Sequence, residues 1–137
     1  MRMNLFPVVA SLGLLLAAGP AVAHHAFSAE FDANRPLRLQ GKVAKTEWIN
    51  PHWWIHIDVE DENGQVLTWA IECGAPNALM RRGLNKNSVP VGTELVIDGF
   101  QAKDGSTTAN ARDITLSDGS TFFVGSSGTG APYDRPR

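Results

Sequence analysis

The sequence predicts a single all-β domain with one short helix. Residues 53–59 alternate apolar and polar side chains with a period of two, which is the pattern of a half-buried strand. Turn sequences rich in Gly, Asn and Asp recur between the apolar segments. Only one stretch, residues 76–83, carries helix start and stop signals. The length of 137 residues and the 43% of hydrophobic side chains fit one globular domain.

The first 23 residues have the order of a secretory signal peptide. Arg2 supplies a positive start, an apolar run covers residues 5–18, and residues 21–23 read Ala-Val-Ala, a cleavage site of the A-x-A type. The apolar run is shorter than the ~20 residues that cross a bilayer. We therefore expect a periplasmic or secreted protein that starts at His24 and has no membrane span after processing. A retained N-terminal anchor is the alternative.

A short arm, residues 24–36, precedes the first strand. Apolar side chains alternate over residues 37–43, and the pattern then slips by one position in residues 44–48. Such a slip beside a glycine, here Gly41, predicts a long strand with a bulge or bend. Asn50-Pro51 ends this strand because proline lacks the backbone donor of the ladder.

The second and third strands, residues 53–59 and 66–72, form a hairpin. A two-residue Asn63-Gly64 turn would pair polar with apolar side chains across it. A three-residue loop with Gly64 in the left-handed conformation instead aligns the apolar positions of the two strands, and burial favours this register. It pairs Val59 with Leu67, Ile57 with Trp69, Ile55 with Ile71, and Trp53 with Cys73. The opposite face then carries His52, Trp54, His56, Asp58, Thr68, Ala70 and Glu72.

The helix and the remaining strands complete the domain. Pro76 suits the first helical turn, Leu79 and Met80 are its expected buried pair, and Gly83 is its stop. Extended segments follow at 95–100, 109–116 and 121–124. Residues 125–137 lack large apolar anchors and are expected to form a flexible tail.

This order of elements is that of an OB-fold-like, five-stranded Greek-key barrel spanning residues 37–124. The curved first strand and the lone helix between the third and fourth strands favour it. A small β-sandwich is the alternative, but it would not need a helix at that place, where it can close the bottom of a barrel.

Several short motifs of the mature chain carry a family resemblance. They are HHAFSAEFD at 24–32, G-K-V at 41–43, W-I-N-P-H at 48–52, W-A-I-E-x-G-x-P-N-x-L-x-R-R-G at 69–83, G-F-x-A-K-D-G-S at 99–106 and A-N-A-R at 109–112. In this order they resemble the small exported bacterial proteins grouped as domain of unknown function 6152. The resemblance implies export and a small β-rich domain. It implies no activity, ligand or functional residues.

The four histidines form two groups, which suggests a metal site. Imidazole is the commonest biological metal ligand, and the free amine of a processed His24 beside its own ring would suit Cu(II). His52 and His56 are about 13 Å apart on an extended strand, so only one of them can join. The predicted copper ligands are His24, His25 and His56. The alternative is that His24-His25 is a hydrophilic start of the mature chain without a metal.

The polar face of the second and third strands is the predicted ligand-binding face. OB-folds bind oligonucleotides and sugars through these two strands, and Trp54 places a large ring there. We predict a cell-envelope binding module that uses Trp54, His56, Asp58 and Glu72. In one alternative Phe27 and Phe31 of the arm cover Trp54, and in another the domain is purely structural.

Other function classes find little support in the composition. The net charge of −2 and the predicted export disfavour nucleic-acid partners. No nucleophile motif or phosphate-binding loop is present, which disfavours catalysis. The single cysteine, Cys73, is expected to be buried, with a disulfide-linked dimer as the alternative. The ligand and the oligomeric state are left open.

Overall fold

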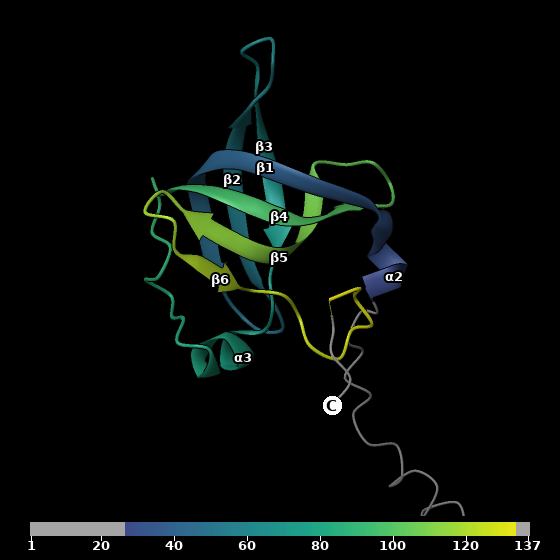
Figure 1. Cartoon of the computed structure of the whole chain (residues 1–137), viewed down its shortest axis with the longest axis vertical. Coiled ribbons are helices and arrows are strands. Elements are labelled where there is room, and N and C mark those ends of the chain that lie inside the picture. The colour runs from purple at the N-terminus through teal and green to yellow at the C-terminus, as the bar shows by residue number, and fades with distance from the viewer. Residues whose placement is uncertain (1–26, 134–137) are drawn as a thin grey trace, which may run out of the picture.

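Five strands close into a ring in the computed structural model, which describes residues 27–133 (Figure 1). Neighbouring strands are antiparallel in the order β3-β2-β1-β4-β5-β6, and a parallel β3–β5 pairing completes the ring. The elements are α2 (Phe27–Glu30), β1 (Phe31–Trp48), β2 (Trp53–Glu60), β3 (Val66–Glu72), α3 (Pro76–Arg81), β4 (Glu94–Ala102), β5 (Thr108–Leu116) and β6 (Thr121–Phe123). The predicted all-β class is confirmed, and α3 lies between β3 and β4 as the OB-like order requires.

The first strand is long and bent. It spans 18 residues and pairs with β2 along one part and with β4 along another. Its pairing with β2 shifts between Val43 and Lys45, where the alternation of the sequence also slips. A side chain at Gly41 would place its Cβ 2.6 Å from the carbonyl oxygen of Asp58, so the close approach of β2 requires glycine there. The strand starts earlier than expected, because Phe31 already pairs with Ala102.

The hairpin of β2 and β3 has the predicted register. Ile55 lies opposite Ile71, Ile57 opposite Trp69, and Val59 opposite Leu67. The turn is closed by a hydrogen bond from the Asp61 amide to the Gln65 carbonyl at 2.8 Å, and Gly64 has a φ of 78°. Burial therefore did select the register that puts one apolar face inward.

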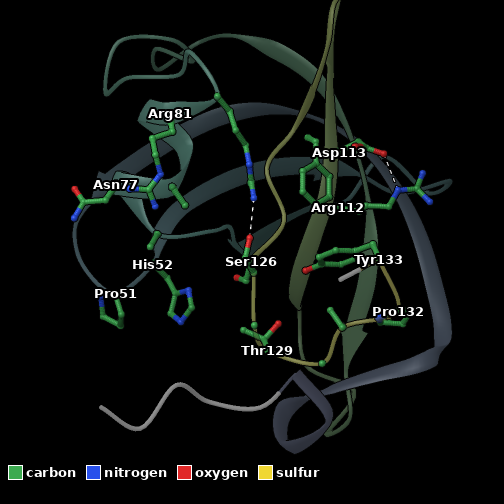
Figure 2. A pocket seen from close by; sticks show the side chains of 18 residues that line it. Pro51, His52, Asn77, Arg81, Arg112, Asp113, Ser126, Thr129, Pro132 and Tyr133 are labelled. Carbon is green, nitrogen blue, oxygen red and sulfur yellow. Dashed lines mark hydrogen bonds and ion pairs between the residues drawn. The ribbon is translucent and has the colours of Figure 1, made fainter. Parts of the chain in front are cut away.

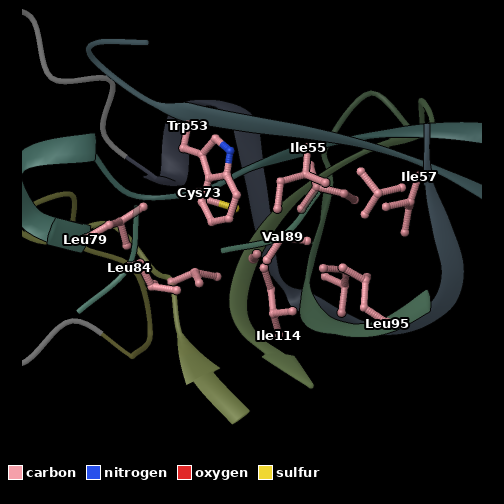
Figure 3. Packing of buried hydrophobic residues seen from close by; sticks show 14 of the residues in the cluster. Trp53, Ile55, Ile57, Cys73, Leu79, Leu84, Val89, Leu95 and Ile114 are labelled. Carbon is pink, nitrogen blue, oxygen red and sulfur yellow. The ribbon is translucent and has the colours of Figure 1, made fainter. Parts of the chain in front are cut away.

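The main core fills the ring with side chains from the inner faces of all five strands (Figure 3). Trp53, Ile55 and Ile57 of β2 are fully buried, and the Trp53 indole donates to Thr46 Oγ1 at 2.6 Å. Leu79 of α3 joins this core, as expected. The prediction for Met80 is wrong: its side chain is 52% exposed. A helix of one and a half turns presents only one narrow face, and the next residue points about 100° away from it.

A second, smaller apolar cluster joins the two ends of the described chain. Phe27, Phe31, Ala102 and Ala131 are buried in it, and Phe100 and Tyr133 pack against them. The Phe27 amide donates to the Thr129 carbonyl at 2.8 Å. Residues 125–133 were expected to form a flexible tail without large apolar anchors, but Ala131 and Tyr133 both pack in this cluster. The expected docking of Phe27 and Phe31 on Trp54 is wrong, because both rings pack in this cluster.

Neither helix in residues 27–133 has the length and apolar character needed to span a membrane.

Candidate functional site

The outer face of β2 carries three of the predicted ligand-binding residues. Trp54, His56 and Asp58 are all half-buried there. His56 Nε2 lies 2.9 Å from Glu47 Oε2 on β1, and Asp58 accepts a hydrogen bond of 2.6 Å from the Thr68 hydroxyl. The hydrogen bond from Lys45, and then that from His56, lower the pKa of Glu47. On this face His56 is thus paired with Glu47, and Asp58 with Thr68.

Glu72, the fourth predicted ligand-binding residue, is not exposed to solvent on this outer face. It lies opposite Trp54 rather than His56, and on its other side β5 places Asn110 next to it. The parallel β3–β5 contact leaves Glu72 only 6% exposed. Asn110 Nδ2 donates to Glu72 Oε1 at 3.1 Å. Glu72 therefore makes no pair with His56, whose partner is Glu47.

The imidazole nearest to Glu72 belongs to His52, just before β2. His52 is 7% exposed, and its Nδ1 lies 3.1 Å from the Cys73 carbonyl and 4.0 Å from Glu72 Oε1. A carbonyl only accepts, so Nδ1 of His52 carries a proton and donates it to this bond. Within residues 27–133, Nε2 has no hydrogen-bond partner. The His52 ring is thus anchored to the backbone of the loop that follows β3.

Four side chains form a connected series that we call the buried polar chain, although only three of them are buried and the fourth, Tyr133, is half-buried. The Tyr133 hydroxyl donates to Asn110 Oδ1, Asn110 donates to Glu72, and Glu72 faces His52. They come from the C-terminal segment, β5, the end of β3 and the entry to β2. Ring closure and the packing of the C-terminal segment together bring these residues close, although they are up to 81 positions apart in the sequence.

Both ends of this polar chain line one pocket, which we call the His52 pocket (Figure 2). Its volume is about 1720 Å³ and it is open to solvent on one side. One wall is formed by α3 and the preceding loop, the opposite wall by residues 126–133. The lining residues are Pro51, His52, Ala75, Asn77, Ala78, Arg81, Arg82, Arg112, Asp113, Phe123 and residues 126–133.

Positive charge dominates the lining of the His52 pocket. Arg112 is neutralised by Asp113, with Nε 2.6 Å from Oδ2. Arg82 donates instead to two neutral acceptors, the Gly125 carbonyl at 2.8 Å and the Ser127 hydroxyl at 2.9 Å, and lies 4.6 Å from the centre of the Phe123 ring. Partial burial lowers the pKa of the Arg82 guanidinium.

Comparison with known proteins places the chain in a family. The model of a family described as of unknown function, DUF6152, matches residues 11–111, which is most of the sequence. The chain belongs to the DUF6152 family. No curated protein and no solved structure matches it. Within the DUF6152 match lie His52, Glu72 and Asn110 together with α3, whereas the wall formed by residues 126–133 lies beyond it.

Sequence reasoning singled out Glu72 but did not join it to His52, Arg81 or Asn110 in one site. His52, Arg81 and Asn110 all stand in motifs that carry the family resemblance, W-I-N-P-H, the run 69–83 and A-N-A-R. Those motifs meet at one end of the ring, which is the signal that could have found the pocket. Tyr133 stands in no such motif.

The predicted copper ligands are divided between described and undescribed parts of the chain. His24 and His25 lie outside the described residues, and so does the proposed signal peptide. Within residues 27–133, no group of three or more His, Cys, Asp or Glu side chains is arranged to hold a metal ion. The copper site stays a prediction.

Proposed function

We propose that this DUF6152 protein is an exported binding module of the cell envelope, and that its small-molecule ligand occupies the His52 pocket. The buried polar chain that ends at the pocket carries this proposal. Burying the Glu72 carboxylate beside an imidazole and an amide is expensive, and apolar residues of similar size often stabilise a fold as well or better. A purely structural domain would gain little from such a chain, whereas a binding site gains two oriented polar groups.

The pocket is a better site than the outer face because its polar groups are less fully paired. On the outer face, His56 is paired with Glu47 and Asp58 with Thr68. At the pocket, the Ser126 hydroxyl is buried without a partner in the described chain, and Arg81 makes no hydrogen bond or ion pair with any described residue. A ligand therefore gains hydrogen bonds at the pocket without first breaking existing ones. The outer-face site of Trp54, His56, Asp58 and Glu72 remains the competing prediction.

Chemical-shift mapping of the processed protein tests the proposal. We would screen a small-molecule library against the ¹⁵N-labelled chain that starts at His24. We expect binders to move the amide signals of His52, Arg81 and residues 126–133. The substitution His52→Ala should lower the affinity of these binders, whereas His56→Ala should not. Shifts confined to Trp54 and His56 would move the site to the outer face. A library without any binder would favour a structural domain.

Copper binding by the processed N-terminus is a second candidate, supported by one contact. The backbone bond between Phe27 and Thr129 holds position 27 at the wall of the His52 pocket. Three residues span at most about 10 Å, so the chain length allows His24 to reach the pocket. His52, whose Nδ1 is oriented by a backbone carbonyl, is then an alternative to His56 as the third copper ligand.

Titration with Cu(II) separates these ligand sets. The expected result is tight binding to the processed protein and at least tenfold weaker binding when one extra residue precedes His24, because the free amine is then displaced. Loss of affinity in His52→Ala but not in His56→Ala would assign the third ligand to the pocket, and the reverse would assign it to the outer face. Equal affinity with and without the extra residue would reject the amine chelate.

A further inference from the structure

We infer that the ligand of the His52 pocket is an organic anion whose carboxylate group binds to Arg81 and Arg82. This inference rests on the proposed function, since it names the class of molecule that the same pocket would take. It is drawn from the charge, the free donors and the size of the pocket.

The charge of the lining is opposite to that of the whole protein. Three arginines and one aspartate line the pocket, and the Arg112–Asp113 pair cancels itself, which leaves Arg81 and Arg82. In the part of the chain that the structure describes, no carboxylate lies within ion-pair distance of either guanidinium. The complete chain has a net charge of −2, so this excess of positive charge is local. A pocket of one sign attracts ligands of the other.

Both guanidinium groups have N–H donors that are not used in hydrogen bonds to described residues. Arg82 is fixed by its bonds to Gly125 and Ser127 and by the Phe123 ring, and it uses two of its five N–H groups in those bonds. Arg81 makes no hydrogen bond or ion pair within residues 27–133, and Figure 2 shows it on the same side of the pocket as His52. A guanidinium presents a planar fork of donors that matches a carboxylate in a bidentate contact.

The size and the apolar lining indicate that the anion is organic. Small-molecule pockets typically measure about 300–1,000 Å³, and this open pocket of about 1720 Å³ exceeds that range. A simple inorganic ion would leave most of it empty. Pro51, Ala75, Ala78, Ala131 and Pro132 supply apolar surface for a carbon skeleton. The Ser126 hydroxyl, buried at the wall without a partner in the described chain, and His52 Nε2 offer further polar contacts.

Matched pairs of carboxylates and primary amides test the charge requirement. Hexanoate with hexanamide, benzoate with benzamide, and succinate with succinamide share a skeleton and differ in charge. Each would be titrated into the processed ¹⁵N-labelled protein at low ionic strength. We expect at least one carboxylate to move the pocket signals and its amide to bind at least tenfold more weakly. Arg81→Gln should lower the affinity for the carboxylate about tenfold or more. Lys86→Gln makes the same charge change at an exposed site outside the pocket and should leave this affinity unchanged.

The outcomes separate this inference from the proposed function. If neutral library members or the amides bind in the pocket as tightly as the carboxylates do, the pocket is a binding site, but the inference that its ligand is an anion fails. If Arg81→Gln and Lys86→Gln lower the affinity for the carboxylate equally, the effect comes from the net charge of the protein rather than from a specific contact, and the inference fails. If nothing in either set moves the pocket signals, both the inference and the proposed function fail.

Discussion

At the scale of single residues, the position of Glu72 shows how burial changes what a side chain does. Its place in the alternation of β3 assigns it to the outer face, which would make it a solvated carboxylate. The parallel contact with β5 covers it, so its charge is met by Asn110 and faced by His52. A buried carboxylate of this kind depends on each of its hydrogen bonds.

Asn110→Ala should therefore destabilise the protein. The change removes the donor to Glu72 Oε1 and the acceptor of the Tyr133 hydroxyl, so two polar contacts in the interior are lost. We expect a loss of about 1–3 kcal/mol in the free energy of unfolding. Urea unfolding followed by tryptophan fluorescence measures it. Asn77→Ala, at an exposed site on α3, is the control and should stay within about 0.5 kcal/mol of the natural protein. An equal effect of the two changes would contradict the role given to Asn110.

Cys73 should be chemically inert in the folded protein. Its thiol is fully buried, and burial, together with the nearby Glu72 charge, raises its pKa. Because the thiolate is the reactive form, a thiol reagent such as Ellman's reagent should not label the native chain within minutes but should label it completely in urea. Rapid labelling under native conditions would show that Cys73 becomes accessible, and would revive the disulfide-linked dimer.

At the scale of elements, the bend of β1 decides whether the ring closes. One strand must pair with both β2 and β4, and it does so through the irregularity between Val43 and Lys45 and the close approach of β2 at Gly41. A straight strand of 18 residues could not serve both neighbours, because a twisted open sheet does not return to its first strand without such bends.

Gly41→Ala should consequently weaken the β1–β2 contact. The new Cβ would stand 2.6 Å from the Asp58 carbonyl oxygen and 3.1 Å from Val59 Cγ2, so the backbones must separate. We expect a loss of about 1–3 kcal/mol in the free energy of unfolding, the range usual for overpacking. Thermal unfolding followed by circular dichroism would report it. Gln40→Ala, at the exposed neighbouring position, should have little effect, and a Gly41→Ala protein as stable as that control would refute the close approach.

At the scale of the whole molecule, the two ends of the described chain stabilise each other and complete the pocket. The second apolar cluster contains α2, the start of β1 and residues 131 and 133, and the same C-terminal segment forms one wall of the His52 pocket. The main core ends at Val124, before this segment begins. Pocket and ring are thus separable parts of one domain.

A chain shortened to end at Val124 should keep the ring and lose the pocket. It lacks the acceptors of Arg82 and leaves Phe27, Phe31 and Phe100 partly uncovered. We expect a strand-like circular dichroism spectrum, a melting temperature lower by about 5 °C or more, and increased binding of the dye ANS. A chain that ends at Tyr133 is the control, and should melt like the full mature protein. Equal melting temperatures for the two shortened chains would show that residues 125–133 do not stabilise the body.

The sequence by itself determined the strands, their inward faces and the hairpin register. These depend on local rules: the alternation of β2, the turn chemistry at Gly64 and the slip of β1 near Gly41 each act within a few residues. The motifs of the DUF6152 family also lie within short stretches, so they were visible along the chain. Local information was sufficient for the family and for most of the elements, but it missed α2 and the early start of β1 at Phe31.

The site depended on contacts that only the tertiary structure provides. Pairing of β3 with β5 buried Glu72 beside Asn110, and the entry to β2 brought His52 to the same place. Packing of the C-terminal segment against Phe27 then supplied Tyr133 and the second wall. Each of these contacts joins residues far apart in the chain, and the free energy that forms them comes from burial shared by the whole core, which no local pattern records.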